Sequence, residues 1–257
     1  MVTGVFIDEG KAQPVVTGWE PIPISRLRRM SRAGARILES YRVLRKTDAN
    51  IVGEVLRGHG EFYELDHYPP GDVYDHDTHA QYYYHAHPPE GRAKRFGPEH
   101  GHFHTFLRPK GMPPKVKPAP VPDYKQPEDD NDALTHFVAI AMNRAGYPIR
   151  LFTTNRWVTG ETWYDAKAVI SILDRFVVDL AYPSWPVNIW ITAMLQLFRP
   201  DIEALLIERD AAILDWQRRH PDENVYEDRR LEITAIRDIS VDAQIARVEK
   251  ALTAVAK

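Results

Sequence analysis

The chain contains no cysteine, which excludes disulfides, thiolate zinc sites, iron–sulfur clusters and cysteine nucleophiles. No run of about 18 apolar residues occurs, so the sequence predicts no transmembrane helix and no membrane partner. The first residues lack the charged segment and apolar core that mark a signal peptide. We therefore expect a cytoplasmic protein in which any metal is bound by His, Asp, Glu or Tyr.

The sequence also lacks a large excess of either charge, because its 33 Lys and Arg residues nearly balance its 36 Asp and Glu residues. A net charge of -3 gives no general attraction to nucleic acid, which is therefore not an expected partner. The exception is the segment 25–46, where a predicted helix has one basic face. That face either binds an anionic partner or pairs with acidic segments of the same chain, and the overall charge favours the second interpretation. Its basic residues are Arg26, Arg28, Arg29, Arg32, Arg36, Arg42, Arg45 and Lys46.

The order of periodic segments predicts an α+β fold in one domain, residues 1–257. A small antiparallel sheet with a histidine-rich face would follow an N-terminal helix and precede several C-terminal helices. N-terminal helices are expected over 25–58, a sheet region over 61–164 with a proline-rich loop at 108–130, and mainly helices over 165–257. The expected strands are 61–67, 81–87, 100–107, 135–142 and 149–157. The expected later helices are 165–180, 187–198, 200–219 and 241–255. Residues 231–237 are expected to form either a strand or a helix.

Nine of the eleven histidines lie in the short stretch between His59 and His104. Within it, His85 and His87 are two residues apart, and so are His100, His102 and His104. Alternate residues of a strand share a face, so each predicted strand carries a row of imidazoles. Imidazole is the commonest protein metal ligand, and the clustering therefore indicates a histidine-lined site.

The relative register of the two histidine strands decides whether the two rows meet. In an antiparallel hairpin, paired residues have a constant sum of residue numbers. A sum near 187 places His87 opposite His100, His85 opposite His102 and Tyr83 opposite His104, on one shared face. A slip by one residue would separate the rows onto opposite faces.

A shared face of imidazoles would suit a metal with open positions for water or substrate. The predicted metal ligands are His85, His87, His100, His102 and His104, and the predicted catalytic residues are Tyr83 and Glu99. A nearby carboxylate would complete a site of the non-haem iron type, while three histidines alone suit zinc. Iron or zinc is therefore the expected cofactor, and haem is the weaker alternative. Candidate carboxylates are Glu64, Asp75, Asp77, Glu90 and Glu99.

The segment His85-Ala-His87-Pro-Pro-Glu90 resembles the first metal-binding motif of the cupins, two histidines one residue apart followed by a glutamate. The resemblance covers six residues and implies a metal at this segment. The glutamate lies closer to the second histidine than in cupins, and no second cupin motif is evident.

Two classes of function remain open from the sequence. The first is a metal-dependent enzyme acting on a small molecule, either an oxygenase with non-haem iron or a hydrolase with zinc. The second is a non-catalytic protein that binds an anionic ligand or a protein partner through the histidine face and the basic helix. His136 opens an apolar strand and shares parity with Val138 and Ile140, so it is either a core residue or part of the site.

Overall fold

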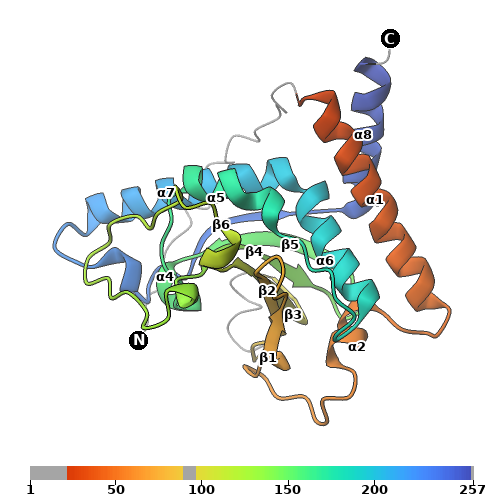
Figure 1. The fold of residues 1–257 in the computed structure, drawn as a ribbon, viewed down its shortest axis with the longest axis horizontal. Helices are drawn as coiled ribbons and strands as arrows, with labels where there is room; N and C mark the ends of the chain where they lie inside the picture. The colour runs from red at the N-terminus through yellow and green to blue at the C-terminus, as the bar shows by residue number, and fades with distance from the viewer. Residues whose placement is uncertain (1–21, 89–96, 256–257) are drawn as a thin grey trace.

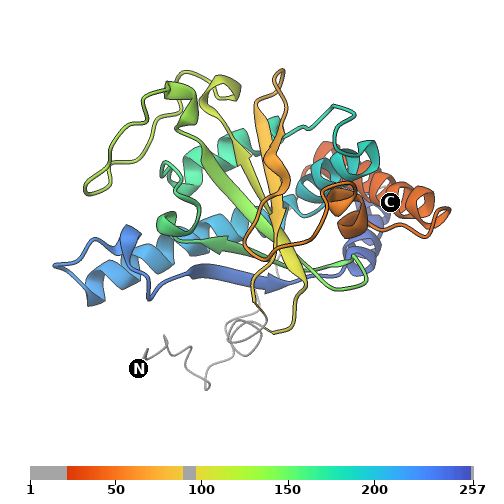
Figure 2. The ribbon, with the colours of Figure 1, turned by 90° about the horizontal axis from the view of Figure 1, so that it is seen from below.

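The computed structural model describes residues 22–88 and 97–255 of the chain. Its centre is a six-stranded antiparallel sheet whose strands follow one another in sequence order (Figures 1 and 2). The strands are β1 (Tyr68–Tyr74), β2 (Ala80–His85), β3 (Gly101–Leu107), β4 (Thr135–Met142), β5 (Pro148–Thr154) and β6 (Ile233–Asp238). The predicted α+β class is confirmed.

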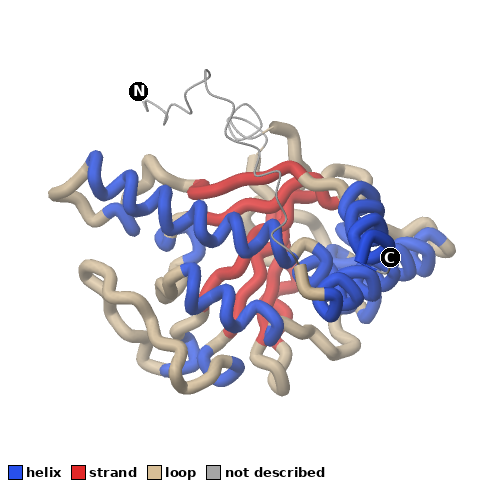
Figure 3. The backbone as a smooth tube through the Cα atoms, turned by 90° about the horizontal axis from the view of Figure 1, so that it is seen from above, coloured by secondary structure: helices blue, strands red, loops and turns tan. Residues whose placement is uncertain are grey.

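Long helices gather over one face of this sheet, as Figure 3 shows from above. None of the helices within residues 22–88 and 97–255 is long and apolar enough to cross a membrane. The helices are α1 (Ile24–Arg45), α2 (Ile51–Leu56), α4 (Arg156–Thr159), α5 (Ala166–Ile172), α6 (Trp185–Leu197), α7 (Arg199–Arg219) and α8 (Val241–Val255), with 3₁₀ turns η1 (Pro109–Gly111), η2 (Asp130–Asp132), η3 (Leu173–Arg175) and η4 (Val225–Glu227).

The main core lies between the sheet and these helices. Phe103 of β3 packs against Trp190 of α6 with ring centroids 5.4 Å apart. The hydroxyl of Tyr82 donates to Asn188 Oδ1 on the same helix, at 2.5 Å. Even-numbered residues of β2 and odd-numbered residues of β3 therefore face the helices, because side chains alternate along a strand. The histidines of the opposite parity are left for the other face of the sheet.

Three predicted elements differ from the structure. The segment 61–67 is not a strand, because Leu65 takes a left-handed conformation with φ of 70° and β1 begins only at Tyr68. The strand expected over 149–157 ends at Thr154, since the side chain of Asn155 caps the short helix α4. The helix expected over 165–180 begins as predicted after Asp165, which caps it, but it ends at Ile172.

The basic face of α1 is partly neutralised by the chain itself. Arg26 pairs with Glu203 of α7 at 3.2 Å, and Arg29 pairs with Asp174 at 2.9 Å. These pairs support the interpretation that acidic segments of the same chain compensate this face.

Candidate metal centre

The hairpin of β2 and β3 has the register that the residue-number sum of 187 predicts. Tyr83 pairs with His104, and His85 pairs with His102. The two histidine rows therefore share one face of the sheet. On the other side of β3, Ala141 pairs with His102 and Ala139 with His104, so small side chains flank the imidazoles there.

Three histidines converge at this position. His85, His102 and His104 each offer one ring nitrogen, and these three atoms all lie within 4.8 Å of one another. The Nε2 atoms of His85 and His102 are 2.8 Å apart. In a tetrahedral zinc site with bonds of about 2.0–2.1 Å, neighbouring ligand nitrogens lie about 3.3 Å apart. We call these residues the histidine triad.

His102 is buried and has an acidic partner, two features that suit a metal ligand. His102 and His104 are each 1% exposed, whereas His85 is half-buried and gives the triad an open side. The carboxylate of Glu99 lies 3.1 Å from His102 Nδ1. A carboxylate accepts the Nδ1 proton, so this contact leaves the Nε2 lone pair of His102 directed toward the triad.

His104 is held by a second, fully buried histidine. His104 Nδ1 lies 3.0 Å from His136 Nε2. Burial lowers the pKa of His136 to about 3, helped by the charge of Arg209, while a hydrogen bond to the backbone of Val138 acts in the opposite direction. His136 is therefore neutral near pH 7. If its proton lies on the nitrogen facing Val138, Nε2 accepts from His104 and leaves His104 Nε2 for a metal.

A β-bulge brings His136 to this face. The pairing of β3 with β4 shifts between Thr105 and Phe106, so Phe106 lies opposite His136. Without that shift, His136 would share a face with Val138 and Ile140, as its sequence parity predicts. The parity expectation is therefore wrong for His136. Of its two proposed roles, the contact with His104 supports the site role.

Tyr83 lies beside the triad and contacts a histidine that the sequence had not indicated as part of the site. Its ring stacks on His67 at 3.6 Å between centroids and lies 5.1 Å from the ring of His104. His67 Nδ1 in turn lies 2.9 Å from a carboxylate oxygen of Asp72. Burial raises the pKa of the Tyr83 hydroxyl well above its usual range, so that hydroxyl stays protonated near pH 7. The catalytic role of Tyr83 stays a prediction.

The other two predicted ligands lie outside the triad. The ring of His87 is 4.7 Å from that of His85 and 5.3 Å from that of His102, which makes it a neighbour of the triad. His100 does not share their face, contrary to the expectation. Its Nδ1 lies 2.6 Å from the hydroxyl of Tyr84, a residue of the opposite parity, because the ladder begins only at Gly101. Burial, together with Arg144, lowers the pKa of His100.

Among the candidate carboxylates in the described part of the chain, only Glu99 contacts the triad. Asp75 accepts three backbone N–H groups, from Asp77, Thr78 and Asp179, so its oxygens serve the local fold. Glu64 and Asp77 are exposed. Glu90, the glutamate of the cupin-like motif, lies outside the described residues.

A buried carboxyl lies behind His136. One oxygen of Glu161 accepts the backbone N–H of His136 at 2.7 Å. Burial raises the pKa of Glu161 to about 7, against the opposing charges of Arg209 and Arg156. Its other oxygen, Oε1, has no hydrogen-bond partner in the part of the chain that the structure describes. From the sequence, Glu161 lies just after the apolar hairpin and far from the histidine stretch, where it could be either a contact for a polar substrate or an exposed strand end.

We predict that Gly101→Ala disturbs the triad, because an added Cβ would lie 2.5 Å from the backbone oxygen of His85 and 2.5 Å from the Tyr84 hydroxyl. The strands must move apart to admit it. Overpacking of this kind costs about 1–3 kcal/mol of unfolding free energy, measurable by urea denaturation. Gly53→Ala on α2 is the control, since its Cβ meets no atom nearer than 3.7 Å and alanine favours a helix. Equal stability of the two variants would contradict this close packing.

The fold and the triad together define an α+β protein with a buried histidine cluster that could hold a metal ion. The chain belongs to the family DUF6969, described as a domain of unknown function, whose model matches residues 31–239. No curated protein and no solved structure matches the chain. The chemistry of the side chains is therefore what indicates a function.

Proposed function

We propose that the histidine triad binds a divalent transition metal, with zinc favoured, and that the protein is a metal-dependent hydrolase of a small molecule. The observation that carries this is the convergence of three imidazole nitrogens within 4.8 Å, with no carboxylate oxygen among them in residues 22–88 and 97–255. Three histidines and one open position are the usual ligand set of a catalytic zinc site. A zinc ion bound there would lower the pKa of its water to about 7 and so supply a nucleophile.

The surrounding residues would orient the metal ligands and bind the substrate. Glu99 orients His102, and His136 orients His104, which holds both ligands in their metal-binding tautomers. The protonated hydroxyl of Tyr83 would donate a hydrogen bond to a substrate oxygen at the open side of the triad. His67 and Asp72 would hold the Tyr83 ring in place through the stacking contact.

We predict that Glu99→Gln weakens metal binding about 10–100-fold, the usual effect of losing an outer carboxylate. A neutral amide accepts the Nδ1 proton of His102 less strongly and makes the imidazole a poorer donor to the metal. Competition with a chromophoric chelator would measure the affinity. Glu64→Gln, which changes an exposed glutamate away from the triad, should bind as the parent does. Equal affinities for both variants would remove Glu99 from the site.

The hydrolase assignment is tested with the zinc-reconstituted full-length chain and two substrates, 4-nitrophenyl acetate and bis(4-nitrophenyl) phosphate. We expect hydrolysis above that of free zinc, with a rate that rises through about pH 7. His104→Ala should abolish it, whereas His220→Ala on the far helix end should not. A protein that holds zinc at the triad and hydrolyses neither substrate above background would overturn the hydrolase assignment.

Iron-dependent oxygenation is the second candidate, supported by the aromatic side chains around the triad. Phe152 lies 5.1 Å from the ring of His102, and Tyr83 stacks between His67 and Phe106. Such a wall limits water, which suits oxygen chemistry. Haem held between two of the triad histidines is disfavoured, because their rings lie only 4.6–5.2 Å apart between centroids. Preference for iron over zinc on reconstitution would select the oxygenase.

A non-catalytic binding protein is the alternative from another class. Its anionic ligand would need protonated histidines and would lose affinity as the pH rises through about 6.5. Metal ligation needs neutral imidazoles and weakens as the pH falls. The neutral state of His136 and the internal pairing of Arg26 and Arg29 both favour the metal.

A further inference from the structure

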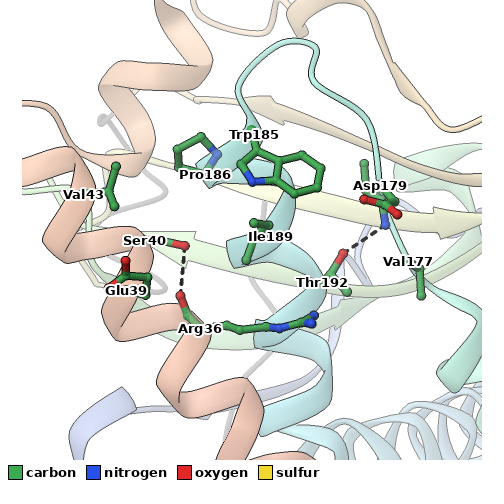
Figure 4. Close-up of a pocket in the computed structure, with 11 residues that line it drawn as sticks. Arg36, Glu39, Ser40, Val43, Val177, Asp179, Trp185, Pro186, Ile189 and Thr192 are labelled. Carbon is green, nitrogen blue, oxygen red and sulfur yellow. Dashed lines mark hydrogen bonds between the residues drawn. The ribbon is translucent and has the colours of Figure 1, made fainter.

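A separate cavity of about 400 Å³ lies between α1, α6 and the segment Val177–Asp179 (Figure 4). It is on the helical side of the molecule, because α6 packs on the sheet face opposite to the triad and α1 packs against α6. Pockets that bind small organic molecules typically measure about 300–1,000 Å³. The cavity therefore has the size of a ligand site that is independent of the metal centre.

One wall of this cavity is apolar and carries an exposed tryptophan. Val43 of α1 and Pro186 and Ile189 of α6 line it, and Trp185 stands at its edge (Figure 4). Trp185 is 49% exposed. A large aromatic surface left open beside a cavity is typical of a binding contact, since it contributes much contact area with little loss of side-chain freedom.

Two opposite charges face the same cavity. The side chain of Arg36 extends from α1 across to the α6 side, and Asp179 lies on the rim beyond Thr192 (Figure 4). Within residues 22–88 and 97–255, neither side chain forms an ion pair or hydrogen bond. Backbone atoms of both residues form hydrogen bonds: the backbone oxygen of Arg36 accepts from the Ser40 hydroxyl, and the backbone N–H of Asp179 donates to Asp75.

Of the three charged residues that line the cavity, Glu39 is already paired, which distinguishes it from Arg36 and Asp179. Glu39 also lines the cavity, but both of its oxygens accept from Arg42, at 2.6 and 2.7 Å. On the same helix, Arg26 and Arg29 pair with acidic residues of other elements. Among the described residues that line it, the cavity thus offers Arg36 as an available cation and Asp179 as an available anion, next to the apolar wall.

We propose that this cavity binds a short zwitterion with an apolar body, either a hydrophobic amino acid or a hydrophobic dipeptide. Its carboxylate would pair with the Arg36 guanidinium, which suits planar two-point recognition. Its ammonium group would pair with Asp179, and its apolar side chain would pack on Trp185 and Ile189. The hydroxyl of Thr192 accepts from the N–H of Val178 at 3.0 Å, so its own proton can be donated to the ligand carboxylate.

Calorimetric titration of the full chain tests the ligand class with four probes. L-phenylalanine and the dipeptide Leu-Phe carry both charges, N-acetyl-L-phenylalanine lacks the cation, and L-phenylalaninamide lacks the anion. We expect one of the two zwitterions to bind at least tenfold more tightly than both singly charged probes, which corresponds to one charge-assisted hydrogen bond. The tighter of the two zwitterions identifies the ligand length.

Variants separate this site from unspecific binding. Arg36→Gln and Asp179→Asn should each weaken binding of the tighter zwitterion at least tenfold, and both positions are exposed, so the fold should not suffer. Arg32→Gln, one helical turn away and outside the cavity lining, should leave binding unchanged. The proposal is wrong if no probe binds at millimolar concentration, if singly charged probes bind as well as zwitterions, or if Arg36→Gln and Asp179→Asn bind as Arg32→Gln does.

Discussion

His102→Ala is expected to abolish stoichiometric metal binding, with a loss of affinity greater than the 10–100-fold that follows loss of an outer partner. His102 is close to both other members of the triad, with its Nε2 atom 2.8 Å from that of His85 and its ring 4.9 Å from that of His104. Removing it leaves two imidazoles, too few to hold a divalent ion in competition with water. Elemental analysis of the purified, untagged protein measures the effect directly.

The matched controls are histidines outside the triad. His100→Ala removes an imidazole that contacts Tyr84 on the opposite face, and His220→Ala removes one at the end of α7. Both variants should retain the metal content of the parent. His87→Ala is the informative intermediate case, because its ring borders the triad without contributing to the 4.8 Å group. A parent protein that contains no metal, and takes up none on reconstitution, would rule out the proposed centre.

Glu161→Gln is expected to remove a pH dependence of stability worth about 3 kcal/mol, because each tenfold difference in proton affinity between the folded and unfolded states is worth about 1.36 kcal/mol. Burial raises the pKa of this carboxyl from 4.5 to about 7 in the folded protein. The folded state therefore binds the proton more tightly than the unfolded state. Its contribution is fully present below pH 4.5 and is lost as the pH rises through 7. The glutamine variant has no such titration.

Urea unfolding of the metal-free protein at pH 5, 6, 7 and 8 tests this directly. The free energy of unfolding of Glu161→Gln minus that of the parent should increase between pH 5 and pH 7 and level off by pH 8, above the folded pKa of about 7. The opposing titration of His136 is common to both proteins and cancels in the difference. Glu249→Gln, at an exposed position on α8, should give a difference that does not change with pH. A constant difference for Glu161→Gln as well would mean that Glu161 is ionised throughout.

The triad could largely be predicted from the sequence, because it depends on strand parity and on one hairpin register. His85, His102 and Tyr83 take the predicted partners, since alternation along two adjacent strands is a local property. The residues behind the triad could not be predicted in the same way. His136 reaches His104 only through the bulge in the β3–β4 ladder, and a bulge reverses the parity on which the prediction depended.

The element boundary that was predicted incorrectly after Asp165 is one that tertiary contacts decide. The helix after Asp165 has helical periodicity as far as Leu180, yet it stops at Ile172 and turns through η3. Beyond this point, Val178 donates to the Thr192 hydroxyl and Asp179 donates to Asp75, which draws the chain away from helical geometry. These partners lie far along the chain, and periodicity within one segment carries no information about them.

Because His85 pairs with His102, a metal ion bound by both residues would also stabilise the fold as a cross-link. The two residues lie on strands joined by a long connection, and an ion held by both would cross-link them much as a disulfide does. Closing a loop of about 15 residues in the unfolded chain is worth about 3 kcal/mol. A chain without cysteine would thereby gain a reversible cross-link in its central hairpin. The stability of that hairpin would then increase with the concentration of free metal ion.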